Sequence, residues 1–278
     1  MSGRGKSNLK GQAEGGRIDV LAIVQARASS SRLPAKVLEP ILGRPMLLRQ
    51  LERLRRCRRI GKLLVATSDN PSDRPIADLC DAESVACFRG SQDDVLDRYY
   101  RAASLYMPTH VVRLTGDCPL ADPELIDSVI EFYLVGGYDF VSNAIEPTFP
   151  DGLDAAVFRF QLLEHAWREA KLPSEREHLT LFMRHHPERY KIGSYKVSPD
   201  RSHMRWTVDE PADLAFVRAI YERLYPGKPN FDSEDIYRLL DAEPGLLRLN
   251  GGIERNEGLR RALQLDNEWK SRNENPNP

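Results

Sequence analysis

The chain has 278 residues and a formal net charge of −1, with 40 lysines and arginines against 41 aspartates and glutamates. This balance excludes the strong overall charge typical of proteins devoted to nucleic acid or to anionic membranes. The four cysteines form no Cys-x-x-Cys pair, and no apolar run approaches the roughly 20 residues of a membrane helix. We therefore expect a cytoplasmic protein with reduced thiols that binds neither nucleic acid nor a membrane.

The first part of the chain alternates between short apolar runs and helical segments. Residues 1–17 contain almost nothing apolar, so we expect a disordered basic tail there. The predicted strands that follow are 20–25, 63–67, 86–88, 110–114 and 138–142. The predicted helices are 45–57, 74–81, 94–105 and 123–134. This alternation predicts an α/β fold with a doubly wound, mostly parallel sheet.

Beyond about residue 151 the alternation becomes looser. The predicted strands are 155–159, 191–197 and 204–208, and the predicted helices are 161–170, 175–185, 211–224 and 233–240. We interpret these elements as an elaboration of the same domain, which then covers residues 18–245. Residues 246–278 would be a C-terminal extension.

A cluster of cations follows the first predicted strand. The segment reads Gln25-Ala-Arg-Ala-Ser-Ser-Ser-Arg-Leu-Pro-Ala-Lys36, so Arg27, Arg32 and Lys36 share one loop with the small residues 28–31. Open α/β sheets bind ligands at the carboxyl ends of their strands. Three cations and a run of unobstructed backbone N–H groups suit a triphosphate. There is no Walker or Rossmann glycine motif here, and the alternative interpretation is an ordinary exposed basic loop.

Two predicted strands each end in an aspartate that is followed, two residues later, by a proline. Gly116 permits a tight turn before Asp117, and Asp209 precedes the helix predicted from Pro211. Carboxylate oxygens are the hard ligands that Mg²⁺ prefers, so we predict that Asp117 and Asp209 hold one ion between them. The alternatives are a turn aspartate that bonds its own backbone and an acid placed beside a helix N-terminus.

Together these segments resemble a known family. Gln25-Ala-Arg-x4-Arg-Leu-Pro-x-Lys36, Gly116-Asp-x-Pro119 and Thr207-Val-Asp-x-Pro211 are similar to motifs of the cytidylyltransferases that activate 3-deoxy-manno-octulosonate and related acidic sugars. The segments 89–99, 150–154 and 174–180 resemble more specifically the branch typified by the spore-coat polysaccharide protein SpsF. The resemblance implies a glycosyltransferase-A-like nucleotide-diphospho-sugar transferase fold.

The resemblance also implies an activity and a set of site residues. The enzyme would use Mg²⁺ and CTP, attach CMP to a small acidic sugar-like acceptor and release pyrophosphate, with Arg32, Lys36 and Asp117 as catalytic residues. The implied nucleotide-binding residues are Gln25, Ala26, Arg27, Arg32, Lys36, Ser68, Asp69, Gly90, Ser91, Gln92, Asp93, Thr115 and Gly116. The implied acceptor-binding residues are Asp151, Asp154, Arg176, Glu177 and His178. They belong to an acceptor-binding and dimerisation elaboration at about 145–205, and we expect a homodimer.

Other functions stay open at this point. A uridylyl- or thymidylyltransferase normally begins its first loop with a glycine-rich stretch, which Gln25-Ala-Arg27 replaces here. A glycosyltransferase that consumes a nucleotide sugar usually carries an Asp-x-Asp metal motif, and neither candidate metal site has one. A non-catalytic nucleotide-binding protein is a further alternative. Residues 91–94 read Ser-Gln-Asp-Asp where the better-known sugar-acid synthetases have Gly-Thr-Asp-Arg, so the acceptor stays unidentified.

Overall fold

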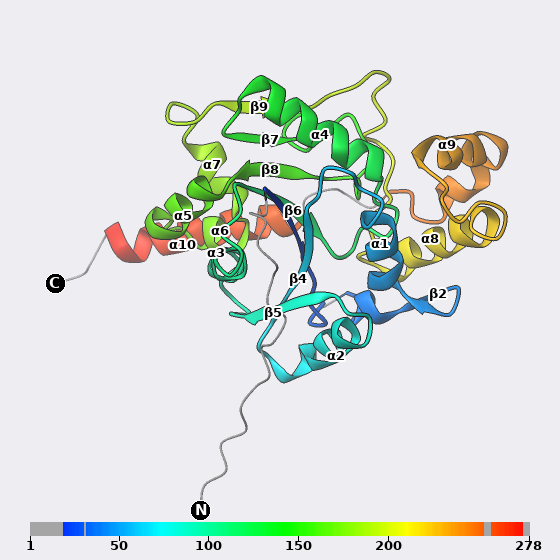
Figure 1. Ribbon diagram of the computed structural model, residues 1–278, viewed down its shortest axis with the longest axis horizontal. Coiled ribbons are helices and arrows are strands. Elements are labelled where there is room, and N and C mark those ends of the chain that lie inside the picture. The colour runs from blue at the N-terminus through cyan, green and yellow to red at the C-terminus, as the bar shows by residue number, and fades with distance from the viewer. Residues whose placement is uncertain (1–18, 31, 253–256, 275–278) are drawn as a thin grey trace, which may run out of the picture.

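A mixed β-sheet forms the centre of the structure, with helices packed on both of its faces (Figure 1). The computed structural model describes residues 19–30, 32–252 and 257–274. Within these residues the sheet has seven strands in the order β5-β4-β1-β6-β8-β7-β9. The predicted disordered tail, residues 1–17, lies outside the described residues.

The elements alternate as predicted through the first half of the chain. The sheet strands are β1 (Val20–Gln25), β4 (Lys62–Ser68), β5 (Ala86–Gly90), β6 (His110–Thr115), β7 (Phe140–Ser142), β8 (Ala156–Arg159) and β9 (Ile192–Ser194). The α-helices are α1 (Met46–Leu54), α2 (Arg74–Ala82), α3 (Val95–Ser104), α4 (Pro123–Gly136), α5 (Phe160–Glu169), α6 (Pro173–Glu177), α7 (Thr180–His185), α8 (Pro211–Leu224), α9 (Ser233–Ala242) and α10 (Glu257–Glu274). The short 3-10 helices are η1 (Lys36–Leu38), η2 (Pro71–Asp73) and η3 (Pro244–Arg248). In the described part of the chain, no helix combines the length and the apolar character needed to span a membrane.

The central strand β1 is buried on both faces. Val20, Ala22 and Val24 pack into the core shared with α1, α4 and α8. Leu21 and Ile23 point to the opposite face and pack against α3 and α5. Because side chains alternate across a strand, the unbroken apolar run of β1 requires a cover on each side of the sheet. The doubly wound arrangement follows from this requirement.

Strand directions bring several chain segments to one edge of the sheet. β1 pairs in parallel with β4 and β6, and β4 pairs in parallel with β5. The carboxyl ends of these four strands therefore share an edge. β8 runs antiparallel to β6 and β7, so its amino end lies at that same edge together with the loop that precedes it. This edge is where ligands bind in open α/β sheets.

The predicted start of α4 is confirmed. The side chain of Asp122 accepts hydrogen bonds from the backbone N–H groups of Glu124 and Leu125 at 2.9 and 3.2 Å, and Pro123 occupies the first helical position. The carboxylate thereby satisfies two of the donors that a helix N-terminus leaves without intrahelical partners. The helix consequently begins directly after the loop that follows Asp117.

The strand predicted at 204–208 is wrong. The structure has a single bridge there, between Arg205 and Asp151, and no ladder. The backbone N–H groups of the segment bond to loops instead: Trp206 donates to the Asp151 carbonyl at 2.6 Å, and Val208 donates to the Asp117 carbonyl at 2.8 Å. The apolar side chains of the segment are buried among helices and loops, which explains why its pattern resembles that of a strand.

Two other local predictions also need correction. The helix predicted at 175–185 is two helices, α6 and α7, because the backbone of His178 leaves the helical region with φ −110° and ψ 72°. The hairpin of β2 (Pro40–Ile41) and β3 (Arg44–Pro45) was not predicted. Its two-residue turn holds Leu42 and Gly43 at positive φ, and leucine gives no sequence signal for that conformation.

The C-terminal helix α10 returns to the body of the protein and packs against α6. The backbone N–H and the hydroxyl of Ser174 donate to the two oxygens of Asp266 at 2.9 and 2.5 Å. Both residues are buried, so this contact holds α10 firmly against α6. The predicted C-terminal extension therefore includes a helix that is part of the domain's packing.

Candidate active site

The loop after β1 crosses closely over the end of β6. The backbone N–H of Gly116 donates to the Gln25 carbonyl at 2.7 Å. A Cβ at Gly116 would lie 2.9 Å from that carbonyl oxygen and 2.9 Å from the Cβ of Ala26. Any larger residue would push the two strand ends apart. Glycine is thus required here for close approach, and it places Asp117 beside the cationic loop.

A buried aspartate fixes the start of the cationic loop. Asp73 accepts hydrogen bonds from the backbone N–H of Ala28 at 2.7 Å and from both the N–H and the hydroxyl of Ser68. The N–H of Ser30 donates to the Ala28 carbonyl at 2.9 Å. The expected run of unobstructed amides is therefore wrong for Ala28 and Ser30. Ser31 lies outside the described residues. Anion binding by this loop must depend more on side chains.

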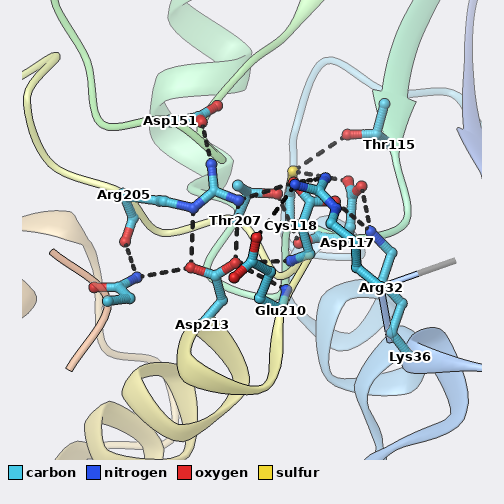
Figure 2. A network of polar contacts seen from close by, with 12 residues as sticks. Arg32, Lys36, Thr115, Asp117, Cys118, Asp151, Arg205, Thr207, Glu210 and Asp213 are labelled. Atoms are coloured by element: carbon cyan, nitrogen blue, oxygen red, sulfur yellow. Dashed lines mark hydrogen bonds and ion pairs between the residues drawn. The ribbon is translucent and has the colours of Figure 1, made fainter. Parts of the chain in front are cut away.

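Lys36 joins the two predicted metal-binding aspartates. Its Nζ donates to Asp117 Oδ2 at 3.0 Å and to Asp209 Oδ1 at 2.7 Å. A guanidinium nitrogen of Arg32 lies 3.3 Å from Asp209 Oδ2 and another lies 3.5 Å from a Glu210 carboxyl oxygen. Figure 2 shows Lys36 and Arg32 reaching these carboxylates from the loop after β1. Two segments about 90 residues apart in sequence, at Asp117 and Asp209, thus meet at one point.

The charges of this cluster stabilise one another. Burial by itself would lower the pKa of Lys36, but the charges and hydrogen bonds of Asp117 and Asp209 outweigh it and raise the pKa. Burial would likewise raise the pKa of Asp117, but Lys36 and the hydrogen bonds from Thr115 and Cys118 bring it to about 2. Lys36 and Asp117 are therefore both ionised at neutral pH.

Arg205 binds the carboxylate oxygen of Asp209 that Lys36 does not bind, and Figure 2 shows it between Asp151 and Asp213. Its guanidinium donates to Asp209 Oδ2 at 2.9 Å, to Asp213 Oδ1 at 2.9 Å and to Asp151 Oδ2 at 3.0 Å. Burial opposes its charge, but the bonds to Asp213 and the neighbouring acids raise the pKa of Arg205. Burial also opposes the ionised form of Asp213, yet Arg205 holds the pKa of that carboxyl below its usual value.

Sequence reasoning assigned no role to Arg205 or Asp213. Asp213 is fully buried and belongs to a capping box with Glu210 at the start of α8. An acid three residues after an N-cap acid is a recognisable helix-start signal, so Asp213 could have been found. Arg205 carries no comparable signal, because its joint contacts with Asp209, Asp213 and the distant Asp151 arise only from the folded arrangement of the loops.

The loop containing Asp151 is locked onto the segment that carries Asp209. Gly152 has φ +107°, and a Cβ there would lie 2.4 Å from the backbone nitrogen of Thr207. Only glycine fits this combination of positive φ and close approach. Because Val208 donates to the Asp117 carbonyl, the segment also fixes the distance between the two predicted metal-binding aspartates.

A cavity of about 790 Å³ opens over this cluster. The predicted site residues among its lining are Gln25, Ala26, Arg27, Arg32, Lys36, Thr115, Gly116, Asp117, Glu177 and Asp209. Ser29 and Ser30, from the predicted small-residue stretch of the loop, also line it, and the lining residues that sequence reasoning missed are Val37, Ala262, Gln264 and Leu265. The last three come from α10. Its amphipathic pattern indicates a packed helix and gives no signal for a ligand.

The remaining predicted residues are not among those that line this cavity. Those at the ends of β4 and β5 are Ser68, Asp69, Gly90, Ser91, Gln92 and Asp93, and those nearer the acceptor segment are Asp151, Asp154, Arg176 and His178. Arg89 links the two strand ends by donating to the carbonyls of Ser68 and Asp69 at 3.1 and 3.0 Å. The guanidinium of Arg176 donates to the Asp94 carboxylate and to the Trp167 carbonyl. Binding roles for this group stay predictions.

A mostly parallel sheet whose strand ends carry a cationic loop and a pair of carboxylates is the arrangement of a nucleotidyltransferase. The family model described as Cytidylyltransferase matches residues 21–228, and the chain belongs to this family. The spore coat polysaccharide biosynthesis protein SpsF of Bacillus subtilis is 33% identical over 236 residues, which cover 81% of this chain and 95% of that protein. The predicted family resemblance is therefore confirmed.

Two further comparisons agree with this assignment. The mitochondrial 3-deoxy-manno-octulosonate cytidylyltransferase of Arabidopsis thaliana is 29% identical over 245 residues, covering 84% of this chain and 76% of that protein. The solved structure of a cytidylyltransferase from Leptospira borgpetersenii serovar Hardjo-bovis has a TM-score of 0.80 at 30% identity, covering 86% of this chain and 100% of that one. The predicted fold class is confirmed as well.

Proposed function

We propose that this protein transfers CMP from CTP to a small, acidic, sugar-like acceptor. An acceptor hydroxyl oxygen attacks the α-phosphorus of CTP, the new phosphorus–oxygen bond replaces the bond to pyrophosphate, and the hydroxyl proton passes to solvent. The observation that supports this most strongly is the meeting of Lys36, Asp117 and Asp209 at the cavity floor. Positioning and charge neutralisation account for most of the catalysis in such transfers.

The cationic loop supplies groups for the triphosphate. Arg27, Arg32 and Lys36 all line the cavity, and each can neutralise phosphate oxygens as negative charge moves onto the leaving pyrophosphate. Guanidinium groups bind phosphate in a bidentate manner, whereas the Lys36 ammonium acts as a point charge. We infer that Arg32 and Lys36 are the catalytic cations.

The two aspartates fit a divalent cation. Asp117 and Asp209 each place a carboxylate oxygen within 3.0 Å of Lys36 Nζ, so their oxygens converge on the position that this ammonium holds in the structure, and an ion bound there would take its place while Lys36 turns to the phosphates. Among the described residues no cluster of three or more His, Cys, Asp or Glu side chains that could hold a metal ion occurs. Asp117 and Asp209 would hold Mg²⁺, with phosphate and water oxygens as its other ligands. The ion would supply charge stabilisation for the phosphates.

The acceptor class is inferred from relatives and from the cavity. The name of the Arabidopsis relative specifies a sugar acid, and that of the Bacillus relative specifies polysaccharide biosynthesis. Among the predicted acceptor-binding residues, Glu177 lines the described cavity. We propose a role in surface polysaccharide or related biosynthesis. The homodimer and the cytoplasmic location stay predictions.

Pyrophosphate release tests the proposal directly. Purified protein is incubated with Mg²⁺, one of the four ribonucleotides or dTTP, and members of a panel of sugar acids, phosphosugars and amino-acid derivatives. We expect release with CTP and a sugar acid, and a larger rise in melting temperature with CTP than with ATP or GTP, because a ligand that binds the folded state stabilises it. Release with UTP or dTTP and a sugar phosphate would instead support a uridylyl- or thymidylyltransferase. If no combination of nucleotide and acceptor releases pyrophosphate, the result would support a non-catalytic nucleotide-binding protein.

A further inference from the structure

The C-terminal helix α10 forms one wall of the cavity, and it lies beyond the part of the chain that the family model matches. Ala262, Gln264 and Leu265 of α10 line the cavity together with Glu177 at the end of α6. The family match ends at residue 228. The matched domain alone therefore lacks this wall.

Buried polar contacts hold the wall in place. The backbone N–H and hydroxyl of Ser174 donate to Asp266, whose side chain lies on the inner face of α10. At the other end of the same short helix, the Arg176 guanidinium binds the Asp94 carboxylate at the start of α3. The helix α6 is thus fixed between α3 and α10. Because the buried contact between Ser174 and Asp266 is costly to break, it holds α10 over the cavity.

The lining residues of α6 and α10 differ in chemistry from those of the loop after β1. Arg27, Arg32 and Lys36 come from the loop after β1, whereas the described lining residues of α6 and α10 include no cation. The Glu177 carboxylate accepts hydrogen bonds, and the Gln264 amide both donates and accepts them. A negatively charged group of a substrate would be repelled from this side and drawn toward the cations. Hydroxyl groups would be bound well.

We propose that α10 completes the acceptor subsite and that Glu177 and Gln264 select the acceptor by binding its hydroxyl groups. Leu265 adds apolar surface on which the ring face of a sugar can pack, and the carboxylate of the acceptor faces the arginines instead. The acceptor class is then a polyhydroxylated acid whose hydroxyl groups lie on the side away from its acid group. This inference rests on the proposed cytidylyl transfer.

The test uses the full-length protein and the sugar acid of the panel that it converts with CTP and Mg²⁺ at the highest rate. The variants are Gln264→Ala and Glu177→Gln, and Asn267→Ala is the control because it removes an exposed amide from the same helix away from the cavity. We expect the KM for the acceptor to rise roughly tenfold in Gln264→Ala, which loses one hydrogen bond, and by a similar factor in Glu177→Gln, which replaces a charged acceptor by a neutral amide. The KM for CTP should stay within about twofold of the wild type.

The possible outcomes distinguish failure of the acceptor-subsite inference from failure of the proposed cytidylyl transfer. If Gln264→Ala and Asn267→Ala have the same acceptor KM as the wild type, α10 does not contact the acceptor, although CTP turnover shows that the proposed function stands. An equal rise in both variants would show a structural role of the helix and would also overturn the inference. If no sugar acid of the panel releases pyrophosphate, the proposed function fails and this inference fails with it. If Gln264→Ala does not fold, the acceptor KM of Glu177→Gln tests the subsite, and an unchanged KM in that variant overturns the inference.

Discussion

Replacing Arg205 by methionine tests the network that orients Asp209. The variant keeps much of the side-chain volume but leaves the fully buried Asp213 without its cation. Removing one partner of a buried ion pair costs about 3–5 kcal/mol. We expect Arg205→Met to lower the free energy of unfolding by about 3 kcal/mol, at the lower end of the range for broken buried pairs. The reason is that Asn250 and the backbone N–H groups of Asp209 and Glu210 still donate to Asp213.

Thermal and urea unfolding measure this effect. At about 2–4 °C per kcal/mol for a chain of this size, the melting temperature of Arg205→Met should fall by roughly 6–12 °C. The matched control is Arg223→Met, because Arg223 pairs with Glu243 at 2.7 Å on the surface, where the side chains are 37% and 46% exposed. Surface pairs contribute about 0–1 kcal/mol, so the control should be nearly neutral.

The pH dependence gives an independent check. The pKa of Asp213 is lower in the folded protein than its unfolded-state value of 3.8. The ionised Asp213 therefore contributes its full stabilisation above about pH 3.8, and this stabilisation is lost as the pH falls through the folded-state pKa. The difference in free energy of unfolding between the wild type and Arg205→Met should therefore become smaller below about pH 4. If the free energy of unfolding of Arg205→Met at pH 7 is less than about 1 kcal/mol below that of the wild type, the buried pair has no stabilising role.

Three further perturbations address the site and the fold. Asp117→Asn and Asp209→Asn should each remove most activity, and the double variant should be little worse than either, because two ligands of one ion act as a unit; additive losses in kcat/KM would contradict the shared ion. Lys36→Ala should lose activity that excess Mg²⁺ does not restore, since it removes a phosphate contact; rescue in a Mg²⁺ titration would assign Lys36 to the metal site instead. Burial, only partly offset by Asp19, lowers the pKa of His110 below 6.5, so stability should rise with pH up to about that value. His110→Gln should flatten this rise in urea unfolding measured from pH 5 to 7, and an unchanged slope would exclude His110 as its cause.

Much of the site could be predicted because its parts are local in sequence. Arg27, Arg32 and Lys36 share one loop directly after an apolar strand, and strand ends of a parallel sheet bind ligands. Asp117 follows another strand end in the same way. The short range of these relations is what makes them visible in the sequence, and the structure brings Lys36 and Asp117 together as the pattern predicts.

The rest depends on contacts between segments far apart in the chain. Arg205 lies in a segment whose alternating apolar residues favour a strand, yet buried packing between loops satisfies the same pattern. The contact of Ser174 with Asp266 spans 92 residues, and neither side chain carries a motif. Tertiary contacts of this kind override local pattern, because burial of a fixed set of side chains can be achieved by more than one backbone conformation.

The hydrogen bonds of Asp73 have a consequence for how tightly nucleotide can be bound. One buried carboxylate holds the backbone of Ala28 and the end of β4, so the first turn of the cationic loop is already ordered before any ligand arrives. The conformational entropy of that turn is lost during folding and does not weaken the association step. Asp73 does not line the described cavity, yet through this preorganisation it would set part of the affinity that we propose the loop has for phosphate.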